Sequence, residues 1–231
     1  MLFYKPPILC YHHVAEEGDP VATVSPAAFR RQIERLAEEG RVVSLEEWVR
    51  AMEKKEKGGP SRPLMLTFDD GYLDTYTEAF PVLQRHRLPA TLFMVTDWVE
   101  KPGFVTWRQL REMARSGWTI GSHTKSHPYL PDLSRGRWEE ELGGSKKILE
   151  DKLQSPVALL SYPVGGYTDE IIEAVRGAGY RAACTTNRAG SRLFHPYRLS
   201  RIKMTEASHP LVVWAKTSGY YEHYKRTKAS H

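Results

Sequence analysis

Short apolar runs alternate with amphipathic segments along most of this chain, and that alternation is what most restricts its fold. The short runs suit buried strands, and the segments with apolar residues three or four positions apart suit helices. Strands that alternate with helices are typical of a parallel sheet with crossover helices. The sequence therefore predicts an α/β protein. About seven strands are expected, at residues 8–11, 64–68, 90–95, 118–121, 157–162, 180–184 and 198–203.

Several helix starts can be read from the sequence. Ser25 stands before a proline, which is a favourable first helical residue. Ser44 with Glu47, and Thr106 with Gln109, have the spacing of a capping box. Helices are therefore expected at residues 26–39, 45–56 and 107–116, and further ones at 134–153, with a weak point at the glycines 143–144, and at 169–178.

Length and composition favour one domain with a substantial core, because 41% of the 231 residues are hydrophobic. We expect a single catalytic domain over residues 1–231, with its core at about 8–217 and a basic tail at about 218–231. No run approaches the roughly 18 apolar residues of a membrane-spanning helix. The net charge is +5, but lysine and arginine are scattered among acids, so no nucleic-acid partner is predicted.

Cys10 and Cys184 both fall within expected strands. Buried free thiols are the commoner arrangement for such cysteines. A disulfide between them stays open, because sequence does not fix their separation.

The strongest local signal is a strand that runs directly into two acids. The apolar residues 64–68 are followed by Asp69, Asp70 and Gly71. Two adjacent carboxylates repel each other, and a bound cation is a natural way to keep one ionised. Asp and Gly are also ordinary turn residues. This segment alone leaves a metal site and a solvated turn equally open.

A second candidate follows another expected strand, where His123 and His127 stand four residues apart. At that spacing two side chains share one face of a helical turn. Two neutral imidazoles and a carboxylate suit a catalytic zinc site, which keeps positions for water and substrate. Because the carboxyl ends of parallel strands meet on one face of a barrel, Asp70, His123 and His127 are predicted to hold one divalent cation. Zinc is favoured, although cobalt, nickel and iron accept the same ligands.

Together these segments resemble the polysaccharide deacetylase family. Residues 67–71 (Thr-Phe-Asp-Asp-Gly) and 123–127 (His-Thr-Lys-Ser-His) resemble its first two motifs, and residues 160–165 (Leu-Ser-Tyr-Pro-Val-Gly) its third. The resemblance covers about residues 8–203. It implies a distorted (β/α)7 barrel resembling a TIM barrel and a hydrolase that removes acetyl groups from a sugar polymer. It also implies Asp69 as the catalytic base beside the cation.

The sequence departs from the family pattern in three places. Ser161 stands where the third motif usually has an arginine that orients the base, and Arg201 is the candidate replacement. The Asp-containing fourth motif has no clear match near residues 185–187. No segment of the C-terminal part is assigned to the late motif that supplies the general acid in the family.

A histidine at the other end of the chain offers a substitute acid. His12 follows the first expected strand directly, and the first strand of a closed barrel neighbours the last. A permuted motif order of this kind resembles the subgroup that deacetylates poly-β-1,6-N-acetylglucosamine in biofilms. His12 is therefore predicted to be the general acid. The alternative is that His12 or His13 only packs against or caps a strand end.

Motif position assigns an oxyanion-stabilising backbone N–H to Val164. Aromatic residues near the expected strand ends could stack on sugar rings or pack in the core. Tyr72, Trp98 and Tyr162 are predicted to contact substrate.

The predicted function is N-deacetylation of poly-β-1,6-N-acetyl-D-glucosamine by a metal-dependent enzyme. Peptidoglycan or chitin-oligomer deacetylation and acetyl xylan esterase activity would use the same residues. A carbohydrate-binding protein with an inactive site is the non-enzymatic alternative. The expected location is secreted or at the cell surface, with association to the cell wall or membrane surface, and the expected state is a monomer.

Overall fold

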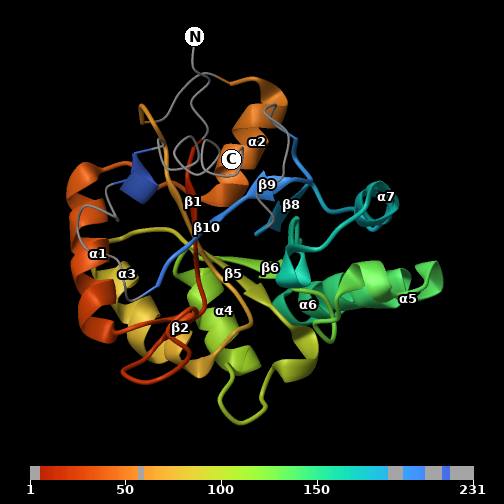
Figure 1. Ribbon diagram of the computed structural model, residues 1–231, viewed down its shortest axis with the longest axis horizontal. Helices are drawn as coiled ribbons and strands as arrows, with labels where there is room; N and C mark the ends of the chain where they lie inside the picture. Colours follow the sequence, from red (N-terminus) through yellow and green to blue (C-terminus); the bar gives the residue numbers. More distant parts are fainter. Residues whose placement is uncertain (1–5, 57–59, 187–194, 206–214, 219–231) are drawn as a thin grey trace, which may run out of the picture.

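In this computed structural model the described residues are 6–56, 60–186, 195–205 and 215–218. Helices surround a central group of strands (Figure 1). These strands form one parallel eight-stranded sheet, in the order β10-β1-β4-β5-β6-β7-β8-β9. The α/β prediction is confirmed. The strands are β1 (Ile8–Tyr11), β4 (Met65–Phe68), β5 (Thr91–Met94), β6 (Thr119–Ser122), β7 (Leu159–Ser161), β8 (Ala182–Thr185), β9 (Leu199–Ser200) and β10 (Ile202–Lys203).

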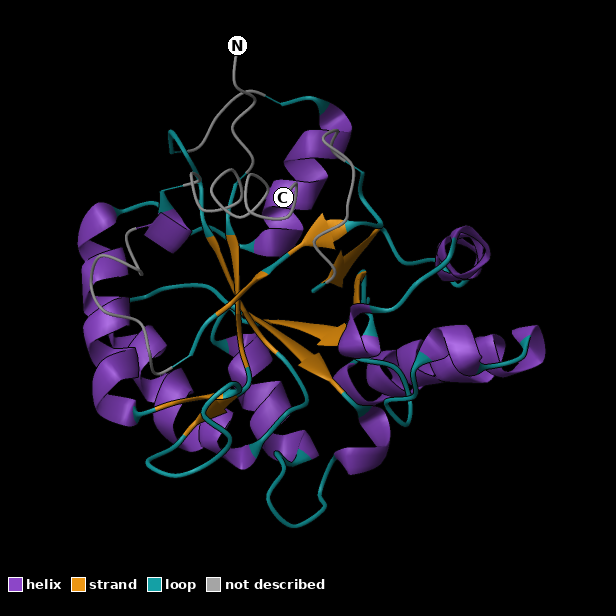
Figure 2. Cartoon of the chain, in the orientation of Figure 1, coloured by secondary structure: helices purple, strands orange, loops and turns teal. Residues whose placement is uncertain are grey.

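The seventh expected strand, residues 198–203, is divided at Arg201 into β9 and β10. Before this break the chain pairs with β8, and after it with β1. The Arg201 N–H donates to the Thr185 carbonyl at 2.9 Å, and the Met204 N–H donates to the Cys10 carbonyl at 2.9 Å. The change of partner brings the two edges of the sheet together, so the sheet is a nearly closed barrel, as predicted (Figure 2).

The expected helix starts are confirmed. Ser25 and Ser44 cap their helices through the side chain, and Thr106 with Gln109 forms a capping box. The second helix ends at Lys54, because Lys55 adopts a left-handed conformation that ends it. The helices predicted from sequence are α1 (Pro26–Glu39), α2 (Leu45–Lys54), α4 (Trp107–Arg115) and α7 (Asp169–Gly177).

The expected helix over residues 134–153 is interrupted by a wider π turn at its weak point. It consists of α5 (Arg135–Glu139), the π turn η4 (Glu140–Gly144) and α6 (Ser145–Leu153). Periodicity does not reveal such a turn, because it inserts about one residue without changing polarity. Sequence reasoning also missed the π turn η1 (Thr75–Ala79), helix α3 (Phe80–Arg85) and the paired strands β2 (His13–Val14) and β3 (Thr23–Val24). The short 3₁₀ segments are η2 (Thr96–Trp98), η3 (Leu130–Asp132) and η5 (Pro163–Gly165).

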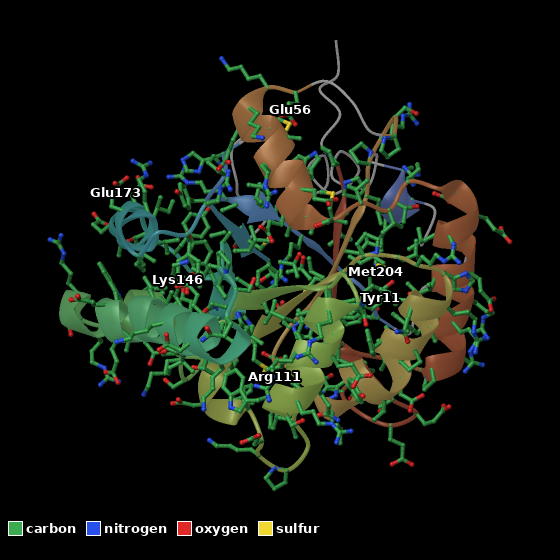
Figure 3. The ribbon with its side chains drawn as sticks, turned by 180° about the vertical axis from the view of Figure 1, so that it is seen from behind. Tyr11, Glu56, Arg111, Lys146, Glu173 and Met204 are labelled. Carbon is green, nitrogen blue, oxygen red and sulfur yellow. The ribbon has the colours of Figure 1, made fainter. Side chains whose placement is uncertain are left out.

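Aromatic rings fill the space between β1, β4 and the surrounding helices. Tyr11 stacks on Phe68 with ring centroids 5.3 Å apart, and Phe68 stacks on Trp118 at 5.2 Å. Tyr11 and Met204 are fully buried and lie in the interior (Figure 3), whereas Glu173 on α7 lies at the periphery. Burial of this kind contributes about 25 cal/mol per Å² of apolar surface, so these rings anchor the strands that carry the site.

Cys10 and Cys184 are both buried and free. None of the helices in the described part of the chain combines the length and apolar character needed to cross a bilayer. The basic tail expected over 218–231 falls, except for Ser218, outside the described residues.

Candidate active site

The two acids lie at the carboxyl end of β4, where the backbone turns sharply. Asp70 has a φ of 72° and Gly71 a φ of 87°. A Cβ added to Gly71 would lie 2.1 Å from the sulfur of Met94 on β5, so only glycine fits this turn. Asp69 and Asp70 are both buried, with relative exposures of 2% and 6%. The tight turn therefore holds two carboxylates inside the protein.

The two histidines lie on an irregular loop after β6. The expectation of a helical turn was wrong, because Thr124 and His127 have φ values of 67° and 64°. Non-glycine residues in this region are strained, at a cost of order 1–3 kcal/mol each. The His127 N–H donates to the Thr124 hydroxyl at 3.1 Å, which closes the loop. The loop brings the two imidazole rings to a centroid distance of 4.8 Å.

Asp70, His123 and His127 converge on one point. Asp70 Oδ1 lies 3.6 Å from His123 Nε2 and 3.5 Å from His127 Nε2. His123 Nδ1 lies 2.7 Å from the Ser161 carbonyl, so that nitrogen carries the proton and Nε2 presents its lone pair. Asp70 Oδ1 is buried and has no hydrogen-bond partner among the described residues. A buried oxygen facing two imidazole nitrogens fits a divalent cation.

Electrostatics also favour a cation here. Burial and the neighbouring Asp69 charge raise the pKa of Asp70 to about 7. Burial lowers the pKa of His123 to about 4 and also lowers the pKa of His127. Both imidazoles are therefore neutral at physiological pH, with lone pairs available. A cation would relieve the unfavourable burial of the Asp70 charge.

Asp69 makes a bidentate ion pair with Arg201. The guanidinium donates from NH1 to Oδ1 and from NH2 to Oδ2, both at 2.6 Å. Arg201 also donates to Thr67 at 3.2 Å and to Ser161 at 2.8 Å. Burial opposes ionisation of Asp69, but Arg201 and nearby histidines together hold its pKa well below the usual range. Arg201 thus reaches Asp69 from the break between β9 and β10, and Ser161 supports it at the position of the missing motif arginine.

His12 lies near Asp69. Its Nδ1 is 4.0 Å from the Cys10 sulfur, which in turn is 3.7 Å from Asp69 Oδ2. Donor atoms of these three residues all lie within 4.8 Å of one another. Burial lowers the pKa of His12 to about 4, although the charge of Asp69 opposes this. His12 is therefore neutral in the free site.

The neighbouring His13 faces a different partner. Its Nδ1 lies 2.6 Å from Asp74 Oδ2, and its ring stacks on Tyr72 at a centroid distance of 3.6 Å. Asp74 also accepts a hydrogen bond from the Val14 N–H at 3.3 Å. The two adjacent histidines thus have different partners, because His12 approaches Asp69 and His13 contacts Asp74. No local sequence pattern indicated the contact between His13 and Asp74.

Val164 has strained backbone. Its φ is 57° and its ψ is 1°, and its side chain is 71% exposed. A β-branched residue in this conformation is an outlier, and such strain gathers at functional sites. Pro163 and Gly165 on either side are buried and hold the turn in place. The structure does not place the Val164 N–H against a reacting atom, so its oxyanion role stays a prediction.

The three predicted substrate aromatics have different environments. Tyr72 stacks on Phe104 at a centroid distance of 5.2 Å, and its hydroxyl opposes the burial that raises the pKa of Asp70. Trp98 is half-buried and lies 5.3 Å from the His127 ring. Tyr162 is fully buried and donates to the Tyr197 carbonyl at 3.2 Å. Tyr162 therefore has no exposed surface with which to contact a sugar, because its ring packs in the core.

Comparison with known proteins gives a consistent result. A family model described as polysaccharide deacetylase matches residues 56–183. YxkH of Bacillus subtilis, assigned as a polysaccharide deacetylase, is 31% identical over 202 residues, which is 87% of this chain and 72% of that protein. The poly-β-1,6-N-acetyl-D-glucosamine N-deacetylase of Staphylococcus epidermidis is 29% identical over 197 residues, 78% of this chain and 67% of that enzyme.

A solved structure supports the same family. The deacetylase PplD of Streptococcus pyogenes, determined in complex with acetate, has a TM-score of 0.85 to this chain. The two are 27% identical, and the alignment covers 92% of this chain and 97% of the streptococcal one.

Proposed function

The chain belongs to the polysaccharide deacetylase family, and from that membership we propose that it is a metal-dependent hydrolase that removes N-acetyl groups from an N-acetylglucosamine-containing polysaccharide. The observation that carries the proposal is the convergence of Asp70 Oδ1 with the two imidazole nitrogens of His123 and His127, directly beside the clamped carboxylate of Asp69. We propose zinc as the resident ion, because two imidazoles and one carboxylate form a common catalytic zinc site.

Poly-β-1,6-N-acetyl-D-glucosamine is the substrate that we propose. One support is the similarity to the staphylococcal enzyme that carries this polymer in its name. A second support is the origin of two residues near Asp69. His12, the proposed general acid, directly follows β1, and Arg201 lies at the break between β9 and β10. Peptidoglycan, chitin oligomers and acetylated xylan remain the competing substrates, since the same carboxylates and imidazoles would serve each of them.

In the proposed reaction, water adds to the acetamide carbonyl carbon and Asp69 accepts a proton from that water. A bound cation supplies Lewis acidity, which lowers the pKa of water and thereby offsets the weak basicity of so strongly ionised a carboxylate. The Val164 N–H donates to the carbonyl oxygen as its negative charge develops. The C–N bond then breaks, the nitrogen takes a proton from His12, and the products are acetate and an amine.

His12 begins this sequence as a neutral imidazole. Negative charge developing on the carbonyl oxygen favours the imidazolium form, because an opposite charge nearby raises the pKa of a histidine. The nearby Asp69 already acts in that direction. The proton that His12 delivers is therefore acquired during the reaction: Asp69, whose carboxylate lies within 4.8 Å of the His12 ring nitrogen, passes on the proton that it took from water. That proton ends on the amine nitrogen, and Asp69 is again a carboxylate.

The decisive experiment measures acetate release and metal content together. Acetate is assayed with oligomers of poly-β-1,6-N-acetyl-D-glucosamine, peptidoglycan fragments, chitin oligomers and acetyl xylan, before and after removal of metal by a chelator. We expect the β-1,6-linked oligomer to be the best substrate and the stripped protein to be inactive until zinc is restored. His127→Ala should lose both metal and activity.

Full activity in the stripped protein would refute the metal-dependent mechanism. A different best substrate would refute only the choice of polymer. Absence of acetate from every substrate, in protein that retains its metal, would favour a carbohydrate-binding protein with an inactive site.

His12→Ala should retain metal but lose acetate release by about 10²–10⁴-fold, the usual contribution of a general acid. The matched control is His13→Ala, whose imidazole faces Asp74 instead of Asp69. Metal analysis with steady-state kinetics checks both variants. An unchanged rate in His12→Ala would remove this residue from the acid role.

Metal binding should weaken on acidification below about pH 7. Asp70 is protonated below its raised pKa of about 7, and the proton must leave before the carboxylate binds a cation. With one proton displaced, the dissociation constant should rise about tenfold per pH unit. Titration with Zn²⁺ between pH 5.5 and 8 measures the slope, and a flat profile would contradict this account of Asp70.

We further propose that the protein acts outside the cytoplasm, associated with the cell wall or membrane surface, because its proposed substrate is an extracellular polymer. We also propose that it acts as a monomer.

A further inference from the structure

The loop that carries His123 and His127 is held by the buried carboxylate of Glu141, which lies outside the motifs described above. Glu141 is 1% exposed. Its Oε2 accepts hydrogen bonds from the N–H groups of Lys125 and Ser126, both at 2.9 Å. Its Oε1 accepts from the Ser126 hydroxyl at 2.7 Å. One side chain therefore binds three donors in the segment between His123 and His127.

The opposite side of the same loop is fixed by backbone donors that follow β5. The Thr96 N–H donates to the Thr124 carbonyl at 3.3 Å, and the Asp97 N–H donates to the Lys125 carbonyl at 2.9 Å. The loop is thus clamped between N–H donors on one side and the Glu141 carboxylate on the other. This satisfies backbone groups that an irregular segment would otherwise leave unpaired.

The π turn η4 explains why Glu141 is aimed at the loop. A π turn frees backbone carbonyls from their usual helical partners. Here the Ser145 hydroxyl contacts the Glu141 carbonyl at 2.7 Å and Ser122 at 2.8 Å, which ties the turn to the end of β6. The Tyr180 hydroxyl donates to the Leu142 carbonyl at 2.9 Å. These buried contacts fix the turn, and with it the direction of the Glu141 side chain.

The charge of Glu141 has no ion-pair partner among the described residues. The nearby Lys125 ammonium pairs instead with Asp97 at 3.5 Å and Glu140 at 3.2 Å. The oxygens of Glu141 are satisfied by the three hydrogen bonds from the loop instead, as buried polar groups require.

We propose that Glu141 is the positioning residue that sets the separation and orientation of His123 and His127 for metal binding; this rests on the metal centre proposed above. His127 follows Ser126 directly and has strained backbone. Without the carboxylate, the loop loses three of the contacts that hold this conformation. The imidazole of His127 is then held less firmly toward Asp70 and His123.

The test uses Co²⁺ as a probe of affinity and of geometry. Purified full-length chain is stripped of metal and titrated with Co²⁺ in competition with a chelator, while its visible absorption bands report the coordination. Glu141→Ala should bind Co²⁺ about 10–100-fold more weakly, the usual effect of losing a residue that supports a ligand, with altered bands. Glu141→Gln should restore most of the affinity and the bands, because the amide can accept both N–H groups and donate to the Ser126 hydroxyl.

Glu139→Ala is the matched control, since that glutamate is exposed at the end of α5, two residues before Glu141. It should bind Co²⁺ like the parent. Unchanged affinity and bands in Glu141→Ala, with normal binding by the parent, would overturn the role of Glu141 alone. Failure of the parent to bind Co²⁺ would instead overturn the metal centre itself.

Should Glu141→Ala not fold, Ser126→Ala decides the question. Ser126→Ala removes one of the three contacts and leaves the π turn untouched, so it should weaken Co²⁺ binding severalfold. Parent-like affinity and bands in Ser126→Ala would refute the proposal.

Discussion

Asp69→Asn should reduce acetate release by about 10²–10⁴-fold, because the amide cannot accept the proton of water. The same substitution should lower the free energy of unfolding by about 3–5 kcal/mol, since it leaves the buried Arg201 guanidinium without its carboxylate. Metal content should persist, because Asp69 is not one of the three converging ligands. Acetate assays, denaturant unfolding and metal analysis measure the three quantities.

Asp132→Asn is a suitable control, because this aspartate is exposed on η3. It should change none of the three quantities appreciably. Parent-like turnover of Asp69→Asn would eliminate Asp69 as the base. Unchanged stability would show that Arg201 finds compensation elsewhere.

Arg201→Met should have the second large effect. Without Arg201, burial is opposed only by the nearby histidines, which are neutral at physiological pH, so the pKa of Asp69 should rise from below the usual range to above it. The acid limb of kcat/KM should move to higher pH, and activity at neutral pH should fall. Removal of one partner from a buried ion pair also costs about 3–5 kcal/mol of stability.

The loss of stability in Arg201→Met has a defined pH dependence. In the parent, the depressed pKa of Asp69 contributes stability above the unfolded-state pKa, and that contribution is lost as pH falls through the folded-state pKa. In the variant, the raised pKa destabilises the protein above the unfolded-state value, and protonation on acidification removes that penalty. The difference between parent and variant should therefore be largest near pH 7 and shrink toward pH 4.

Arg198→Met provides the control, because Arg198 forms a partly exposed ion pair with Asp169. Arg201→Lys retains a charge without the bidentate geometry and should recover part of the stability. A pH–rate profile that does not move in Arg201→Met would show that the ion pair only stabilises the fold.

Features with a local cause could be predicted from the sequence. The buried strands are continuous apolar runs, and the helix starts at Ser25, Ser44 and Thr106 depend on one side chain and one nearby N–H. The convergence of Asp70 with the histidines was also predictable, since motif residues after parallel strands meet on one face.

Features that depend on distant contacts could not be predicted. Thr124 and His127 have left-handed backbone although neither is glycine, so no residue type signals the loop. Glu141 resembles any polar residue of a surface helix until the π turn directs it inward. Tyr162 was expected at a substrate surface because its position after a strand does not reveal that the Tyr197 segment covers it.

Because the last expected strand is divided at Arg201, the site around Asp69 depends on the final part of the barrel. Residues 65–161 contain Asp69, the three converging ligands and Glu141, whereas the guanidinium that holds Asp69 ionised arrives only with β9 and β10. His12, at the other end of the chain, reaches Asp69 through β1, which pairs with β10. A barrel without these last strands would therefore lack the guanidinium that orients Asp69, so the complete site requires the two ends of the chain to be joined.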